Sequence, residues 1–271
     1  MKCKINFLLV VLFFIALKGF SQSVSISPSR LYYKTPIGEY KTQEVTVTNN
    51  ASVKQSFTVT FSDFEPSGSQ GKSKFMNKGE SEHSCAQWLT ANPSFFELEA
   101  GQSQKIQVLM QVPTSPEANK VKWAAMQIKL TKERQNGESG DKNSIGMGIT
   151  ETFQFIVHVF QTPPTVTNKS AELQSLKEIT EPGDSVRTLA LQVYNNGESI
   201  LDCASYLEYT QVNTGEEQRQ KPFAFTLLPG SSRIVKFQMP KDLKGKYSIL
   251  GVVDIGSREN VLAAELEIDM K

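Results

Sequence analysis

Few side chains in this sequence are suited to acid–base, nucleophilic or metal chemistry. Its 271 residues include two histidines and three cysteines. His83 and Cys85 are two potential metal ligands close together, but a zinc site needs three or four. The sequence contains neither a Gly-x-Ser-x-Gly nucleophile motif nor a glycine-rich phosphate loop. We therefore expect a protein that is not an enzyme and that holds no metal or cofactor.

The charge balance argues against nucleic acid as a partner. The chain has 29 basic and 28 acidic residues, for a net charge of +1. A surface that binds nucleic acid needs an excess of Lys and Arg to neutralise phosphates. We expect neither nucleic-acid binding nor electrostatic attachment to an anionic membrane.

Residues 1–21 have the pattern of a cleaved secretory signal. Two lysines precede an apolar run over 5–17, and Gly19 and Ser21 stand where a signal peptidase needs small residues. The alternative is a signal anchor, but the run is shorter than the roughly 20 residues that span a bilayer. Cleavage would remove three lysines and no acid, so the net charge would fall from +1 to −2. We expect a periplasmic or secreted protein with no membrane span after cleavage.

Export would permit a disulfide between the two cysteines that remain after cleavage. Cys85 and Cys203 lie in different halves of the chain, so a bridge between them would join two domains. The alternative is two separate buried thiols, because Cys203 lies in the strand-like run 200–209. Both interpretations remain open at this stage.

Alternation of apolar and polar residues predicts β-strands along most of the chain. The clearest examples are 23–33, 43–48, 55–61, 104–112 and 152–160. Short strands separated by Asn-Asn, Pro-Gly and Ser-Gly turns are typical of an antiparallel sandwich. The sequence therefore predicts an all-β fold. Two polar stretches, 65–84 and 132–143, are predicted to be surface loops or long hairpin connections.

One pattern occurs twice in the same order. The strand-like segment 45–50, which ends in Asn-Asn, is echoed by 191–196. A second segment, 96–101, ends in Ala-Gly and is echoed by 225–230, which ends in Pro-Gly. The repetition indicates a duplicated sandwich unit.

The boundary between the two units is predicted at Thr-Pro-Pro-Thr, 162–165. Consecutive prolines lack amide donors and cannot continue a central strand. After a signal at 1–21, this gives an N-terminal domain over 22–161 and a C-terminal domain over 166–271.

A long predicted strand over 144–161 carries apolar side chains at alternate positions. Ile145, Met147 and Ile149 lead this series, and two phenylalanines continue it. Its 18 residues would extend about 60 Å, more than a small sandwich needs. Two interpretations are open. The apolar face packs against the protein's own core, or the surplus end of the strand pairs with a strand of a partner protein.

Several segments of the first half resemble successive landmarks of the PapD-like periplasmic chaperones of pilus assembly. These segments are 24–33, the Asn-Asn pair at 49–50, 92–102 and 122–128. The resemblance implies two immunoglobulin-like domains and a chaperone that binds exported or surface protein subunits. These subunits are called clients below.

The same resemblance implies a client-binding site. In that family an arginine of the first strand binds the client's C-terminal carboxylate in the cleft between the domains, and Arg30 stands at the matching position. A guanidinium suits a carboxylate because it can donate two parallel hydrogen bonds. Ile145, Met147 and Ile149 match the alternating residues that the family presents to a client that lacks a strand.

Two observations favour other possibilities. The family pairs its arginine with a lysine near the last strand of the first domain, whereas 152–160 contains no Lys or Arg and has His158 as its one potentially cationic residue. Segments 123–126 and 245–252 are also similar to sandwich domains of bacterial surface proteins. That similarity implies a structural or adhesin-associated module that binds cell-surface components.

Overall fold

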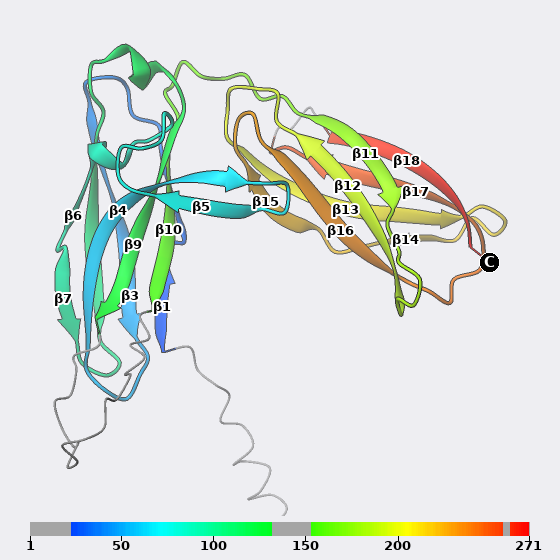
Figure 1. Ribbon diagram of the computed structural model, residues 1–271, viewed down its shortest axis with the longest axis horizontal. Coiled ribbons are helices and arrows are strands. Elements are labelled where there is room, and N and C mark those ends of the chain that lie inside the picture. Colours follow the sequence, from blue (N-terminus) through cyan, green and yellow to red (C-terminus); the bar gives the residue numbers. More distant parts are fainter. Residues whose placement is uncertain (1–22, 132–152, 257–260, 271) are drawn as a thin grey trace, which may run out of the picture.

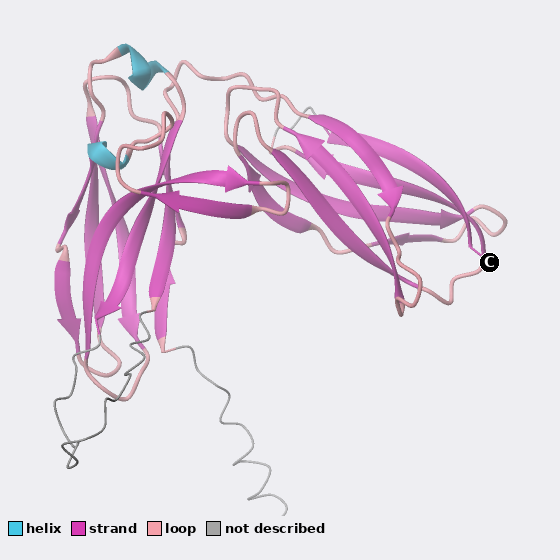
Figure 2. Ribbon diagram, viewed as in Figure 1, coloured by secondary structure: helices cyan, strands magenta, loops and turns pink. Residues whose placement is uncertain are grey.

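The computed structural model describes residues 23–131, 153–256 and 261–270, so the predicted signal segment lies outside it. These residues form β-strands and two short 3-10 helices, which confirms the predicted all-β class (Figures 1 and 2). Two sandwiches meet at an angle (Figure 1). The described residues include no helix long and apolar enough to cross a membrane.

The N-terminal sandwich consists of two packed sheets. Its strands are β1 (Val24–Ser27), β2 (Arg30–Tyr33), β3 (Tyr40–Asn49), β4 (Gln55–Ser67), β5 (Lys72–Met76), β6 (Leu89–Asn92), β7 (Phe95–Leu98), β8 (Ser103–Gln111), β9 (Lys122–Thr131) and β10 (Gln154–Gln161), with helices η1 (Ala86–Trp88) and η2 (Pro116–Asn119). One sheet has the order β1-β3-β8-β6, and the other has β2-β10-β9-β4-β5 with β7 also on β4. The pairing of β2 with β10 is parallel, and the other strand pairs of this sandwich are antiparallel.

The C-terminal sandwich repeats this design with fewer strands. Its strands are β11 (Glu172–Glu178), β12 (Val186–Tyr194), β13 (Leu201–Gln211), β14 (Glu217–Arg219), β15 (Phe223–Leu227), β16 (Ser232–Pro240), β17 (Gly245–Asp254) and β18 (Val261–Met270). Its sheets have the orders β11-β12-β16 and β14-β13-β17-β18, with β15 also paired to β13.

Alternation along the strands builds a separate core in each sandwich. Val45 and Val47 of β3 are fully buried against Ile106 and Val108 of β8, while the residues between them are more exposed. Burying one such side chain contributes about 1.5–3 kcal/mol, so the period-two pattern fixes which face points inward. A second cluster of the same kind fills the C-terminal sandwich.

The predicted single strand over 23–33 is two strands in opposite sheets. Val24–Ser27 pairs with β3 in one sheet, and Arg30–Tyr33 pairs with β10 in the other. Pro28 has no amide hydrogen and cannot continue the β1 ladder, so the chain crosses between the sheets at this point. This crossing places Arg30 at the beginning of β2.

The predicted loop over 65–84 is in part a β-hairpin. β4 continues to Ser67 and β5 returns antiparallel to it, so that Glu65 is paired with Lys74. β5 and the end of β4 at 65–67 are exposed or half-buried, which is why their polar composition resembles that of a loop. In Figure 1 the hairpin extends from the N-terminal sandwich toward the C-terminal one.

A buried asparagine fixes the end of β3. The Asn49 side chain is fully buried and donates hydrogen bonds to the carbonyl oxygens of Val53 (2.8 Å) and Leu98 (2.9 Å). Its backbone carbonyl accepts from the amide of Gly101 at 2.8 Å. We call this arrangement the asparagine corner.

The second sandwich has the same corner at Asn195. Its buried amide donates to the carbonyl oxygens of Ser199 (2.9 Å) and Leu227 (3.0 Å), and its backbone carbonyl accepts from Gly230 at 3.0 Å. Within each sandwich, the strand that ends in Asn-Asn therefore contacts the segment that ends in Gly. The repetition in the sequence corresponds to this hydrogen-bonded corner, which occurs once in each sandwich.

Contacts between the sandwiches come from several elements. Trp123 and Phe160 of the first domain pack in one apolar cluster with Ile200 and Leu228 of the second. At the tip of the β4–β5 hairpin, the Ser69 carbonyl accepts a hydrogen bond from the amide of Ile234 at 2.8 Å. The junction therefore combines apolar packing with directional bonds.

Candidate functional site

Arg30 lies at the junction of the two domains. It is exposed at the first position of β2, and its neighbour across the sheet is His158 of β10. Among the described residues, no carboxylate forms an ion pair with Arg30, although Asp202 and Asp254 line an adjoining hollow. The neighbouring Tyr32 hydroxyl donates to Asp202 at 2.7 Å and ties β2 to the second domain. The guanidinium is therefore available to an external anion.

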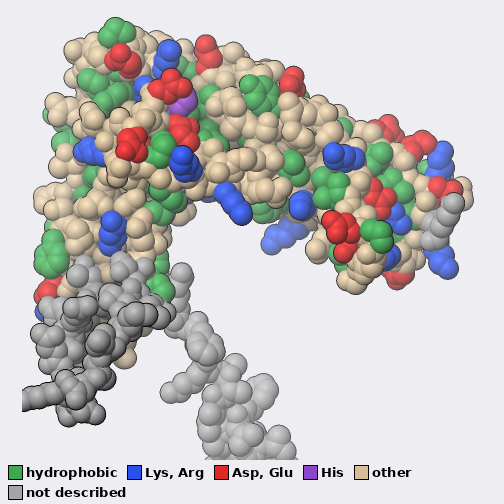
Figure 3. Space-filling view, in the orientation of Figure 1, with side chains coloured by type: hydrophobic (Ala, Val, Ile, Leu, Met, Phe, Trp, Pro, Cys, Tyr) green, Lys and Arg blue, Asp and Glu red, His purple; other side chains and the backbone are tan. Residues whose placement is uncertain are grey.

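A pocket of about 260 Å³ lies between the domains beside Arg30. Arg30, Lys72 and Arg233 line it, and no aspartate or glutamate is found among the described residues of its wall. Phenylalanines from both domains provide apolar surface. In Figure 3 basic side chains lie along the inner side of the angle between the two domains. The pocket therefore combines positive charge with apolar walls.

His158 does not replace the lysine that the sequence lacks here. Burial, and secondarily the charge of Arg30, lowers the pKa of His158 below its usual value. The ring lies edge-on to Phe64, with the ring centroids 4.9 Å apart, and stacks with Phe160. We conclude that His158 is neutral at neutral pH and belongs to the apolar wall of the pocket.

Arg233 is the residue of this pocket that the sequence did not reveal. It comes from β16 of the second domain, and its Nε is buried without a hydrogen-bond partner in the described part of the chain. Its guanidinium carbon lies 5.7 Å from the centroid of the Phe225 ring. A side chain at Gly71 would collide with the Arg233 guanidinium, so the hairpin backbone lies directly against it. One signal was present, an arginine three residues after the Pro-Gly turn and near the start of an apolar strand.

One half of β10 has an open edge. β2 covers this edge from His158 onward, whereas residues 154–157 pair with β9 on one side and with no described strand on the other. The amide of His158 points toward β2, where it donates to Ser29. Because backbone groups alternate along a strand, the amides of Gln154 and Ile156 point to the open edge. This edge offers unsatisfied donors and acceptors to another strand.

The apolar stripe predicted for this strand faces inward from Phe155 onward, whereas Phe153 is half exposed. Phe155 packs against the core of the N-terminal sandwich and Val157 is buried in it. Ile145, Met147 and Ile149 lie outside the described residues. From Phe155 onward, the stripe therefore belongs to the protein's own core.

The disulfide considered for Cys85 and Cys203 is not formed. Both thiols are free and buried, Cys85 in the core of the first domain and Cys203 in that of the second. Burial raises the pKa of Cys203 to about 12, and it raises the pKa of Cys85 strongly as well. A bridge is excluded because each side chain fills a different core, which corrects that alternative.

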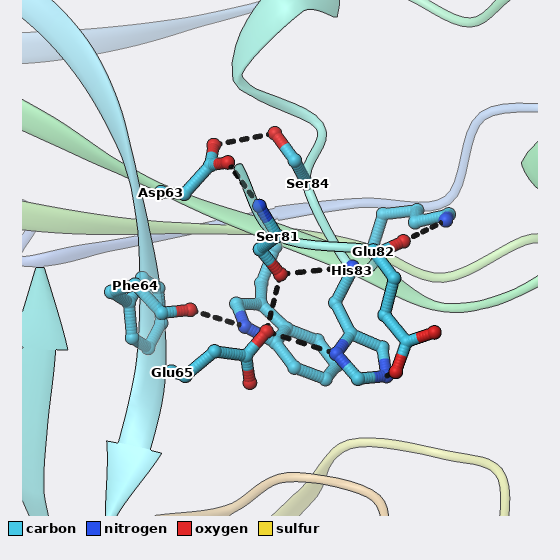
Figure 4. Close-up of polar contacts among 9 residues, drawn as sticks. Asp63, Phe64, Glu65, Ser81, Glu82, His83 and Ser84 are labelled. Atoms are coloured by element: carbon cyan, nitrogen blue, oxygen red, sulfur yellow. Dashed lines mark hydrogen bonds and ion pairs between the residues drawn. The ribbon is translucent and has the colours of Figure 1, made fainter. Parts of the chain in front are cut away.

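A polar cluster near the junction holds the segment that follows the hairpin (Figure 4). The buried Asp63 carboxylate accepts from the amides of Gly79 (2.9 Å) and Ser81 (2.8 Å). His83 Nδ1 lies 2.9 Å from Glu65, which the Ser81 hydroxyl also contacts. Since the hydroxyl is bound to a carboxylate and not to the imidazole, the cluster lacks the geometry of a serine nucleophile and its base.

No metal centre is built from these groups. The described residues contain no cluster of three or more potential ligands. His83 is turned toward Glu65 and stacks on the indole of Trp123, with centroids 4.2 Å apart, while Cys85 is buried in the core. The cluster therefore connects β4 to the segment 79–84.

The fold and the cleft define a protein of two immunoglobulin-like sandwiches with a cationic pocket between them. The chain matches no protein-family model and no curated protein. It is similar in fold to the Escherichia coli chaperone DraB, with a TM-score of 0.46 and 16% identity, over 90% of this chain and 98% of that one.

Two further solved complexes are similar to this chain. One is the CsuC–CsuE complex of a chaperone with a tip adhesion subunit from the archaic chaperone-usher Csu pili of Acinetobacter baumannii, with a TM-score of 0.47, 12% identity and coverage of 89% of this chain and 98% of that chain. The other is the Salmonella enterica SafA pilin with the SafB chaperone, with a TM-score of 0.43, 14% identity and coverage of 92% and 98%. All of these are likenesses of fold.

Proposed function

We propose that this chain is a non-enzymatic, chaperone-like factor of the bacterial periplasm. It holds an exported subunit of a surface or pilus-type structure by β-strand addition until that subunit is assembled. The observation that carries the proposal is the open edge of β10 at residues 154–157, which ends beside Arg30.

The edge and the arginine define how a client strand would bind. β2 occupies the β10 edge from His158 onward, and Arg30 lies opposite His158. A strand added to 154–157 therefore has one end next to Arg30. If the added strand runs parallel to β10, that end is its C-terminus, and its carboxylate meets a guanidinium that has no ion-pair partner among the described residues.

The segment before β10 extends this proposal. Ile145, Met147 and Ile149 precede β10 in the sequence with the same alternation. We assign them to contact with the client along the same line as the open edge. A substitution of Met147 by glutamate should then abolish client capture while the fold persists.

The direct test removes one outward amide from the open edge. Gln154 is exposed, and its amide points away from β9, so Gln154→Pro deletes a donor to the client without breaking the β10–β9 ladder. Gln154→Ala is the matched control. Tagged mature protein should capture exported subunits from a periplasmic extract as wild type and as Gln154→Ala, but not as Gln154→Pro.

Arg30→Gln tests the terminal contact separately. It should weaken capture because it removes the guanidinium that faces the client carboxylate. Equal capture by wild type, Gln154→Pro and Arg30→Gln would refute strand addition at this edge.

A further inference from the structure

We propose that Arg233 of the second domain is the second cationic anchor for the client's C-terminal carboxylate, acting with Arg30 of the first domain across the pocket between them. The inference rests on the proposed function and specifies its binding site. It assigns to the second domain a role that the sequence resemblance places near the last strand of the first.

The composition of the pocket supports an anionic ligand. Arg30 and Arg233 line the pocket from different domains, and Lys72 of the hairpin is a third cation. No acid among the described residues lines the pocket, and the imidazole of His158 is kept neutral by its surroundings. Positive charges that are not compensated within the protein favour a ligand that supplies the negative charge.

Arg233 is held in place but incompletely satisfied. Its Nε is buried and has no hydrogen-bond partner in the described part of the chain. Arg233 also forms no ion pair with a carboxylate of the described residues, so its positive charge is not compensated within that part of the chain. Burial also lowers the pKa of the Arg233 guanidinium, although arginine stays charged at any physiological pH.

The β4–β5 hairpin orients this guanidinium toward the first domain. Gly71 has a positive φ of 74°, and its lack of a side chain leaves the space that the guanidinium fills. Next to Arg233, Ile234 donates its amide to the Ser69 carbonyl at 2.8 Å. The second anchor is thus supported by backbone of the same domain that carries Arg30.

The test compares two short synthetic peptides of alternating valine and threonine. One ends in a free carboxylate and the other in an amide, and both carry a fluorescent label at the N-terminus. Binding to the mature protein is measured by fluorescence anisotropy for wild type, Arg30→Gln, Arg233→Gln and Arg233→Lys. Lys236→Gln is the matched control, because Lys236 is an exposed cation on the same strand that does not line the pocket.

Arg233→Gln should weaken binding of the acid peptide about tenfold to a hundredfold and leave binding of the amide peptide unchanged. Arg233→Lys should retain part of the affinity because it keeps the charge but loses the fork of donors. Lys236→Gln should change neither peptide. Inorganic phosphate should compete with the acid peptide in wild type and less well in Arg233→Gln.

Different results overturn different claims. Loss of acid-peptide binding in Arg30→Gln but not in Arg233→Gln would overturn the second anchor and leave the proposed function intact. Equal weakening of both peptides by Arg233→Gln would show a structural role at the junction and would also overturn it. Equal binding of both peptides to wild type, or binding of neither, would overturn the carboxylate contact of the proposed function and the second anchor with it.

Discussion

Replacement of Asn49 by aspartate tests how the strands of the first domain are joined. The two side chains have the same shape, but a carboxylate cannot donate to the carbonyl oxygens of Val53 and Leu98, which lie 2.8 and 2.9 Å from the amide nitrogen. Each lost bond to a buried carbonyl costs about 1–3 kcal/mol, so the pair costs about 4 kcal/mol. This is a large share of the 5–15 kcal/mol that typically separates folded from unfolded domains.

The assay is urea denaturation followed by tryptophan fluorescence. The sequence has two tryptophans, Trp88 and Trp123, and both belong to the N-terminal sandwich. With a slope of about 2 kcal/mol per molar urea, the midpoint should fall by about 2 M. The exposed neighbour provides the control Asn50→Asp, which should shift the midpoint little.

Acid gives a second signature of the same defect. Burial raises the pKa of an aspartate at position 49 above its ordinary value of about 3.9, because the charged form is disfavoured there. The protonated acid regains one donor, so stability recovers below the unfolded-state pKa and is lost as pH rises through the folded-state pKa. A decrease in the free energy of unfolding of less than about 1 kcal/mol at neutral pH, or an equal decrease in Asn50→Asp, would refute the conclusion that the asparagine corner stabilises the end of β3.

Two further predictions concern the thiols and the domain junction. Burial raises the pKa of Cys203 to about 12 and that of Cys85 further, so neither thiol should react with a thiol reagent in the native protein at neutral pH. Both thiols should react after unfolding without reductant. A protein mass that changes on reduction would contradict this prediction. Burial and the hydrogen bond to Asp202 raise the pKa of Tyr32 from 10.0 to about 12, so Tyr32→Phe should remove a late step from the tyrosinate absorbance titration. The Tyr32–Asp202 contact stabilises the fold below pH 10, and this contribution is lost as pH rises toward 12. If the titration step that disappears in Tyr32→Phe lies near pH 10, the raised pKa of Tyr32 is refuted.

Local pattern was sufficient to predict the class of fold and the repeated unit, but not the buried hydrogen bonds of the asparagine corners. Period-two alternation follows directly from the geometry of a strand with one buried face, as at Val45 and Val47. The repeated Asn-Asn segments were visible because the corner that contains Asn49 needs the same residue types in both domains.

Features that depend on distant segments were not predictable from the sequence. The passage of 23–33 from one sheet to the other depends on which partners each half finds, and alternation is the same in both cases. The β4–β5 hairpin was mistaken for a loop because exposed strands can be polar on both faces. Arg233 lies against Gly71 and shares a pocket with Arg30 only after the two domains pack together, and no local sequence pattern indicates this.

The contact of the hairpin with β16 also bears on whether the second domain can exist alone. β16 is an edge of the sheet β11-β12-β16, and the Ser69 carbonyl satisfies the amide of Ile234 near the beginning of that edge. A chain cut at 162–165 separates the domains in the sequence but removes this cover. The uncovered edge is a template for pairing with a second copy, so the isolated C-terminal domain is expected to self-associate.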